Sequence, residues 1–92
     1  MKVRFLKRAV RDLHQIEEYI RAESPSGAAR VGARIRKRAE DLGQFPFQGT
    51  KSEHADLFQL YVARTPYILI YRVRNDEVHV ITVVHASQRR RS

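Results

Sequence analysis

The stretch 67-YILIYRVRNDEVHVITVVH-85 decides the fold, because it joins two apolar, β-branched runs through a polar turn. Its first and last thirds are rich in Ile, Val and Tyr, which fit a pleated strand surface. Between them lie Asn75 and Asp76, two residues that tolerate the positive φ of a tight two-residue turn. The stretch therefore predicts a β-hairpin with strands at 67–73 and 78–85.

The turn also predicts the register of this hairpin, since residues at equal distance from it face each other. The expected pairs on one face are Val73 with Val78, Tyr71 with Val80 and Leu69 with Thr82. On the other face they are Ile70 with Ile81, Ile68 with Val83 and Arg72 with His79. Both faces are largely apolar, so both need a cover. An apolar face without a cover usually marks a binding surface.

Two amphipathic helices are predicted before the hairpin. In the first, at 8–22, apolar residues recur every three or four positions, at Ala9, Leu13, Ile16 and Ile20. The second, at 25–42, starts with Ser24 as its N-cap and Pro25 at the first helical position, where the missing N–H costs nothing. So short a connection predicts an antiparallel helical hairpin.

The remaining segments predict two more strands and a loop. Residues 2–6 alternate polar and apolar side chains, and residues 57–64 form a third strand directly before the hairpin. The loop at 44–56 contains Phe45 and Phe47, which we expect to pack against the core. The chain is thus predicted to be one α+β domain over 1–92, with a small twisted antiparallel sheet. The sheet has an N-terminal strand and three consecutive C-terminal strands, the helical hairpin covers one face, and a basic tail follows at 86–92.

The composition describes a small and strongly basic chain. Its 92 residues carry a formal net charge of +8 and include no cysteine. Such a charge attracts nucleic acid, anionic membranes or acidic proteins without choosing among them. The N-terminus has no signal-peptide pattern, and no run approaches the roughly 18–20 apolar residues of a membrane span. We therefore expect a soluble, cytoplasmic protein without a membrane partner.

No cofactor or metal is expected. The four histidines, His14, His54, His79 and His85, show no spacing typical of metal ligands. Thiolate ligands are excluded because the chain lacks cysteine.

Five segments together resemble the RelE/ParE superfamily of toxins from type II toxin–antitoxin systems. They are 9-AVRDLHQIEEYI-20, 25-PSGAA-29, 45-FPFQG-49, 66-PYILIYRV-73 and 83-VVH-85 with arginines after it. They cover nearly the whole chain in the right order, and the first helix and the PY strand are more similar to the ParE branch than to the RelE branch. The resemblance implies a twisted sheet with a helical hairpin on one face and an antitoxin encoded alongside.

The resemblance also suggests which residues meet the partners. The residues expected to contact a ParD-like antitoxin are Arg30, Arg34, Lys37, Arg38, Tyr67 and Tyr71. Those expected to contact the target are His85, Arg89, Arg90 and Arg91. Operator DNA would be reached only through the antitoxin. The alternatives are that the helix arginines form a solvated face, that the tyrosines are packing residues, and that the arginine tail acts only through its charge.

The two branches of the superfamily differ in activity, and this sequence departs from the nuclease branch. RelE-like toxins cleave mRNA on the ribosome, which needs cations and proton-transfer groups around the scissile phosphate. Alignment on Pro66 and Tyr67 places Gln59 and Tyr61 where that branch commonly has lysines, and it places Ile68 directly after the pair. A nuclease would have to use the residues that remain, which are Arg64, Arg72, His85 and Arg89.

We therefore predict a ParE-like toxin of the plasmid-stabilisation type that inhibits DNA gyrase by binding and is neutralised by a ParD-like antitoxin. The first alternative is a RelE-like, ribosome-dependent mRNA endonuclease. The second is a non-toxic subunit of the same fold that acts only in an autoregulatory antitoxin–DNA complex.

Overall fold

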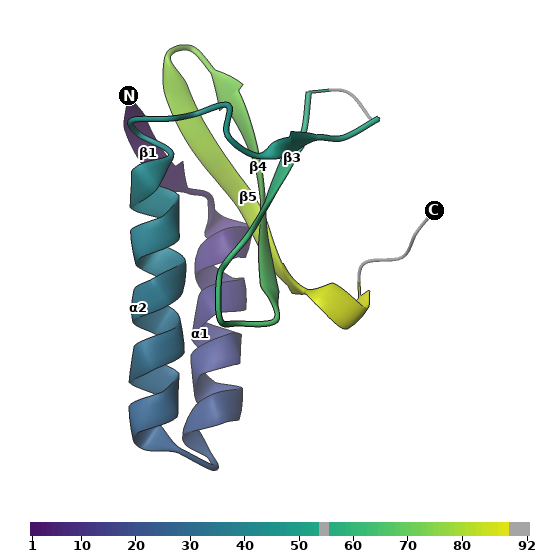
Figure 1. Ribbon diagram of the computed structural model, residues 1–92. Coiled ribbons are helices and arrows are strands. Elements are labelled where there is room, and N and C mark those ends of the chain that lie inside the picture. The colour runs from purple at the N-terminus through teal and green to yellow at the C-terminus, as the bar shows by residue number, and fades with distance from the viewer. Residues whose placement is uncertain (54–55, 89–92) are drawn as a thin grey trace.

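The computed structural model describes residues 1–53 and 56–88, in which two helices pack on one face of a five-stranded sheet (Figure 1). The helices are α1 (Lys7–Arg21) and α2 (Pro25–Asp41), and a short 3₁₀ helix, η1 (Ala86–Gln88), follows the last strand. The strands are β1 (Lys2–Phe5), β2 (Thr50–Lys51), β3 (Phe58–Tyr61), β4 (Tyr67–Arg74) and β5 (Glu77–His85). The predicted α+β architecture is confirmed.

The sheet has the order β1-β5-β4-β3-β2. It is mixed instead of antiparallel throughout as predicted, because β1 lies parallel to β5 whereas the other neighbours are antiparallel. The chain leaves β1 through the helical hairpin and returns at the opposite edge of the sheet. Most observed bounds lie within one residue of the predicted ones, and two differences are larger. The strand expected at 57–64 ends at Tyr61 because Thr65 N–H already turns back onto the Val62 carbonyl, and β2 lies in the segment expected to be a loop.

The β4–β5 hairpin has the predicted turn, since Asn75 and Asp76 have φ values of 54° and 61°. The pairs nearest the turn are also as predicted: Val73 with Val78, Arg72 with His79 and Tyr71 with Val80. Farther from the turn the predicted register is wrong by one residue. The observed pairs are Ile70 with Thr82, Leu69 with Val83 and Ile68 with Val84. A β-bulge that leaves Ile81 as an extra residue in β5 causes this shift.

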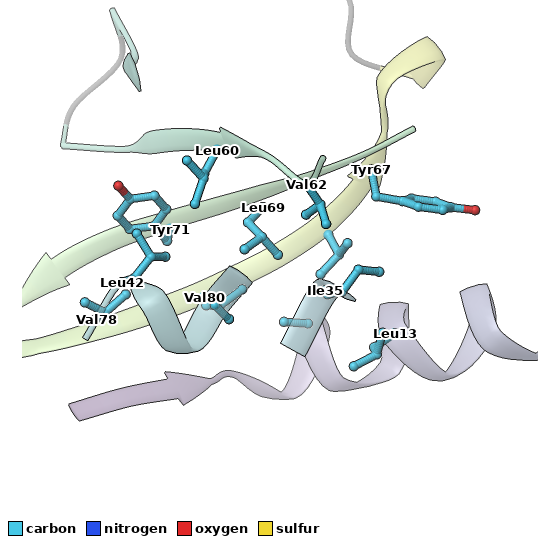
Figure 2. Packing of buried hydrophobic residues seen from close by; sticks show 13 residues of the cluster. Leu13, Ile35, Leu42, Leu60, Val62, Tyr67, Leu69, Tyr71, Val78 and Val80 are labelled. Carbon is cyan, nitrogen blue, oxygen red and sulfur yellow. The ribbon is translucent and has the colours of Figure 1, made fainter. Parts of the chain in front are cut away.

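The hydrophobic core lies between the helices and one face of the sheet (Figure 2). Ala9 and Leu13 of α1 and Ile35 and Ala39 of α2 pack there with Leu42. The sheet contributes the facing side chains of Leu60, Leu69, Tyr71, Val78, Val80 and Val83. The helical periodicity seen in the sequence therefore marks the buried face of both helices.

Tyr71 connects this core to the loop after α2. Its side chain has no exposed surface, and its ring stacks on Phe58 with centroids 5.3 Å apart. The Tyr71 hydroxyl accepts a hydrogen bond from the Gly49 N–H at 3.0 Å. Phe45 and Phe47 do not enter the core as expected, since each remains 63% exposed, although the Phe47 ring contacts Phe58. The Gly49 hydrogen bond and the Phe47 ring contact thus tie this loop to the sheet, while the side chains of Phe45 and Phe47 stay largely at the surface.

The sheet face away from the helices is less exposed than the sequence suggested. Register places Tyr61, Ile68 and Val84 side by side on this face. Ile68 is fully buried and Val84 is half-buried, whereas Tyr61 remains 59% exposed. η1 continues the chain directly from the end of β5 (Figure 1). The expected broad apolar patch is therefore reduced to the surroundings of Tyr61.

Helix α1 completes the edge of β5 where β1 stops. The last pair of the β1–β5 ladder joins Phe5 to Val80. Beyond it, Asp12 Oδ2 accepts hydrogen bonds from Val83 N–H at 3.0 Å and from Thr82 Oγ1 at 2.5 Å. A carboxylate on the helix thus satisfies a backbone donor that the short edge strand leaves unpaired. Ser24 caps α2 as predicted, with its Oγ accepting from Gly27 N–H at 3.0 Å.

We expect Asp12→Ala to lower the free energy of unfolding by about 2 kcal/mol, because it removes two hydrogen bonds to a charged acceptor. For a domain of this size that loss corresponds to a Tm decrease of roughly 8–16 °C. Thermal unfolding followed by circular dichroism measures it. Asp12→Asn keeps an oxygen acceptor and should lose less. Equal stability of Asp12→Ala and the wild type would contradict this role.

Tyr71 predicts a loss of stability at alkaline pH. Burial raises the pKa of its hydroxyl above the ordinary value of 10.0, although the Gly49 hydrogen bond and Arg38 act in the opposite direction. Because the pKa of this hydroxyl is higher in the folded than in the unfolded protein, the protonated hydroxyl stabilises the folded state fully below pH 10. This stabilisation is lost as pH rises through the folded-state pKa. The Tyr71→Phe variant lacks the hydrogen bond to Gly49, so at pH 8 its free energy of unfolding should be about 1 kcal/mol lower than that of the wild type. This difference should shrink above pH 10, as urea unfolding between pH 8 and 11.5 can measure. A difference that stays constant would contradict the burial of this hydroxyl.

Candidate functional site

A basic groove of about 530 Å³ runs between α2 and the turn that joins β3 to β4. Its cationic side chains are Arg30, Arg34, Lys37 and Arg38 of α2 and Arg64 of the turn; its apolar side chains are Ala33, Val62 and Ala63. The four helix cations lie on one face because positions i, i+4, i+7 and i+8 share a face of an α-helix. No acidic side chain lines this groove among residues 1–53 and 56–88. We call these eight residues the basic groove.

The cations of the basic groove fall into two groups. Lys37 Nζ is paired with Asp41 at 3.1 Å, and Arg38 donates to Gln48 at 3.0 Å and lies 3.6 Å from Asp41. Arg30, Arg34 and Arg64 make no ion pair or side-chain hydrogen bond with any described residue. Of these three, Arg34 is half-buried and the other two are exposed. The groove therefore presents three arginines whose hydrogen-bond donors are available to a partner.

A second groove, of about 680 Å³, lies between α1 and the C-terminal end of β5. Its apolar side is formed by Ile16, Ile20, Val31, Tyr67 and Val83, and polar side chains, among them Arg8, Tyr19 and His85, stand around it. Burial and, to a smaller extent, Tyr19 raise the pKa of Tyr67, so that its hydroxyl stays protonated at neutral pH. This groove combines an apolar interior with a rim on which Arg8 and Asp12 offset each other's charge, unlike the basic groove.

His85 stands at the edge of this second groove in a defined tautomer. Its ring packs edge-on against Tyr67, with centroids 5.4 Å apart. The Ser87 backbone N–H donates to His85 Nδ1 at 3.0 Å. A backbone N–H can only donate, so Nδ1 is the acceptor and the proton of the neutral ring lies on Nε2. Neutral His85 can therefore donate a hydrogen bond from Nε2 but cannot accept a proton there, as a general base at that atom would have to.

The structure separates the residues expected to contact the antitoxin. Arg30, Arg34, Lys37 and Arg38 come together in the basic groove, whereas Tyr67 lines the second groove. The prediction for Tyr71 is wrong, because this side chain has no exposed surface with which to meet a partner. Tyr71 lies two residues after the fully buried Leu69, so the alternation of side chains along a strand places both on the same face. This spacing is the sequence signal that could have assigned Tyr71 to the core.

The described residues of the alternative nuclease set are distributed over two grooves and one sheet face. Arg64 lines the basic groove, His85 lines the second groove, and Arg72 faces His79 across the β4–β5 pair on the sheet face away from the helices. The positions that align with nuclease lysines, Gln59 and Tyr61, lie in β3 on that same face. Arg89, Arg90 and Arg91 lie outside the described residues. The sequence missed Arg64 as a member of the basic groove, because only the fold places the β3–β4 turn beside α2.

Two further observations concern the chemistry of the described segments. Within residues 1–53 and 56–88, no three His, Asp or Glu side chains gather in a way that could hold a metal ion. No helix in these segments has the length and apolar character needed to cross a membrane.

Comparison with known proteins places the chain among toxins. Residues 3–90 match the family described as "ParE toxin of type II toxin-antitoxin system, parDE". Y4kP of Sinorhizobium fredii, whose name describes it as a toxin, is 38% identical over 95% of this chain and 90% of its own length. Toxin RelE2 of Caulobacter vibrioides is 35% identical over 88% of this chain and 90% of its own.

Solved structures share the fold. The chromosomal ParDE toxin–antitoxin system of P. aeruginosa matches with a TM-score of 0.81 over 92% of this chain and 95% of that chain, at 24% sequence identity. The toxin–antitoxin complex RelBE2 of Mycobacterium tuberculosis matches with a TM-score of 0.64 over 91% of this chain and 95% of that chain, at 29% identity. Because the family match spans nearly the whole chain and both curated relatives exceed 30% identity, this chain belongs to the ParE toxin family, within the RelE/ParE superfamily of type II toxin–antitoxin toxins.

Proposed function

We propose that this toxin inhibits DNA gyrase by binding it in the cytoplasm and is neutralised by a ParD-like antitoxin. The observation that carries the proposal is the distribution of the ionisable side chains. Arg64 and His85 line different grooves, Arg72 lies on the sheet face away from the helices, and the positions that align with nuclease lysines hold Gln59 and Tyr61. A binding toxin needs a surface of suitable shape and charge, whereas a nuclease needs cations and proton-transfer groups around one phosphate.

The basic groove supports the antitoxin part of the proposal. The solved relatives are toxin–antitoxin systems, and one of them is a ParDE system. An acidic antitoxin segment would find unpaired donors at Arg30 and Arg34, and such charge complementarity accelerates association as well as selecting the partner. Lys37 and Arg38 add positive charge, although Asp41 offsets part of it. Operator DNA would then be contacted by the antitoxin rather than by this chain.

The C-terminal end of the chain is proposed to meet the target. His85 offers an Nε2–H donor at the edge of the second groove. In the sequence, Arg89, Arg90 and Arg91 follow it closely, and these residues complete the proposed contact with gyrase or with the DNA that gyrase holds. This role needs hydrogen-bond donors and positive charge but no proton transfer, which suits the tautomer of His85.

Two parallel assays separate the proposed function from its nuclease alternative. Antitoxin-free toxin added to gyrase and supercoiled plasmid should yield trapped linear DNA, and the same protein added to translating ribosomes should leave the message intact. A heat-denatured sample serves as the control. Message cut in the ribosomal A site with plasmid unaffected would establish the RelE-like alternative. No effect in either assay would favour a non-toxic subunit that acts only in autoregulation.

The second prediction concerns the antitoxin. Arg30→Glu combined with Arg34→Glu should slow association with the antitoxin by about tenfold or more at low salt, and less at 0.5 M salt, because screening removes the electrostatic attraction. Stopped-flow or surface plasmon resonance measures the rate. Lys7→Glu combined with Arg11→Glu changes the charge equally at exposed sites outside both grooves. Equal rates for the two double variants would mean that the α2 arginines are only a solvated face.

A further inference from the structure

Arg64 has a backbone conformation that arginine rarely adopts. Its φ is 65°, in the left-handed region where a side chain with a Cβ atom is strained. Within residues 1–53 and 56–88, the other non-glycine residues with positive φ are Asn75 and Asp76, which tolerate this region because their short polar side chains bond locally. Glycine or asparagine at position 64 would form the same turn with less strain.

The turn itself is held by other residues. Val62 N–H donates to the Tyr67 carbonyl at 3.0 Å, and Thr65 N–H donates to the Val62 carbonyl at 3.1 Å. The Thr65 hydroxyl donates to the same Val62 carbonyl at 2.9 Å and accepts from Tyr67 N–H at 3.1 Å. The Arg64 side chain takes part in none of these bonds. Stability of the turn therefore does not explain the arginine, and strain at such a residue is a sign of function.

The surroundings of Arg64 indicate what this function is. Arg64 forms one wall of the basic groove, and the unpaired Arg30 and Arg34 come from the other wall on α2. Like charges around one groove repel each other in the free protein, and an anionic partner relieves that repulsion. Ala33 of α2, Ala63 of the turn and the buried Val62 line the same groove, so its surface also includes apolar patches made by small side chains.

We infer that Arg64 is a specificity-determining contact for an acidic, amphipathic protein segment that lies in the basic groove. The segment places apolar side chains on Ala33 and Ala63, and its carboxylates receive hydrogen bonds from Arg30, Arg34 and Arg64. The apolar patches favour a peptide over a nucleic-acid backbone, whose sugar–phosphate chain is charged along its whole length. The inference rests on the proposed function, in which this segment belongs to the antitoxin, and it adds a residue on the sheet side to the contacts expected from α2.

The decisive variant is Arg64→Asn, because asparagine accepts positive φ while lacking the guanidinium. Its Tm should equal or exceed that of the wild type, whereas its affinity for the antitoxin encoded next to the toxin gene should fall by about ten- to a hundredfold, the usual effect of losing a hydrogen-bonded charge. Isothermal titration calorimetry measures the affinity. Arg11→Gln removes one charge from an exposed site on α1 outside both grooves and should leave the affinity within about twofold, as is usual for a charge outside the contact.

Each other outcome overturns the inference in a distinguishable way. Wild-type affinity of Arg64→Asn, with tight binding of the antitoxin by the unmodified toxin, would refute the role of Arg64 and leave the proposed function standing. Failure of the unmodified toxin to bind the antitoxin would refute both. If Arg64→Asn loses affinity for a 20-base-pair DNA duplex but keeps its affinity for the antitoxin, the groove binds nucleic acid instead of an acidic segment.

Discussion

The antiparallel pairing of β4 with β5 is the interaction on which the rest of this structure depends. β1 attaches to one side of this pair and β3 to the other, and the inward-facing side chains of both strands form the floor of the core. The pairing is specified at two points. The turn at Asn75 and Asp76 sets the register near the tip, and the bulge at Ile81 resets it toward the open end. The bulge brings Val83, instead of Thr82, opposite Leu69, so that an apolar side chain enters the core at that level.

The helical hairpin covers one face of this sheet and leaves a groove along each of its borders. One groove follows α1 and the end of β5, and the other follows α2 and the β3–β4 turn. The two grooves differ in charge because α1 and α2 carry different ionisable side chains where they border the grooves. Asp12 of α1 is engaged by Thr82 and Val83 in holding β5, whereas α2 presents Arg30 and Arg34 without acidic partners. A fold with a single core thus carries two surfaces of different chemistry.

This division of surfaces bears on the proposed inhibition by binding. The alternative nuclease would use Arg64, Arg72 and His85 around one phosphate, whereas Arg64 and His85 line different grooves and Arg72 lies on the sheet face away from the helices. In His85 the bond from Ser87 N–H keeps Nδ1 unprotonated, so the ring is a hydrogen-bond donor at Nε2. The charge on α2 meanwhile lies on a helix face that the core does not need. Charge can therefore serve recognition there without a cost to the apolar packing.

The sequence by itself determined both helices, the β4–β5 hairpin and the family to which the protein belongs. The period of the apolar residues identified both helices and their buried faces, Ser24 identified the start of α2, and the NDE turn identified the hairpin, because these signals are local. It also identified Arg30, Arg34, Lys37 and Arg38 as one face of a helix.

Only the tertiary structure decided what depends on residues far apart in the chain. The bulge at Ile81, the parallel pairing of β1, the burial of Tyr71 under Gly49, and the contacts of Asp12 with β5 all arise from packing between separate elements. The same holds for Arg64, since the spacing of 26 to 34 residues between it and the α2 cations carries no periodic signal. Arg64 lines the basic groove only because the fold places the β3–β4 turn beside α2.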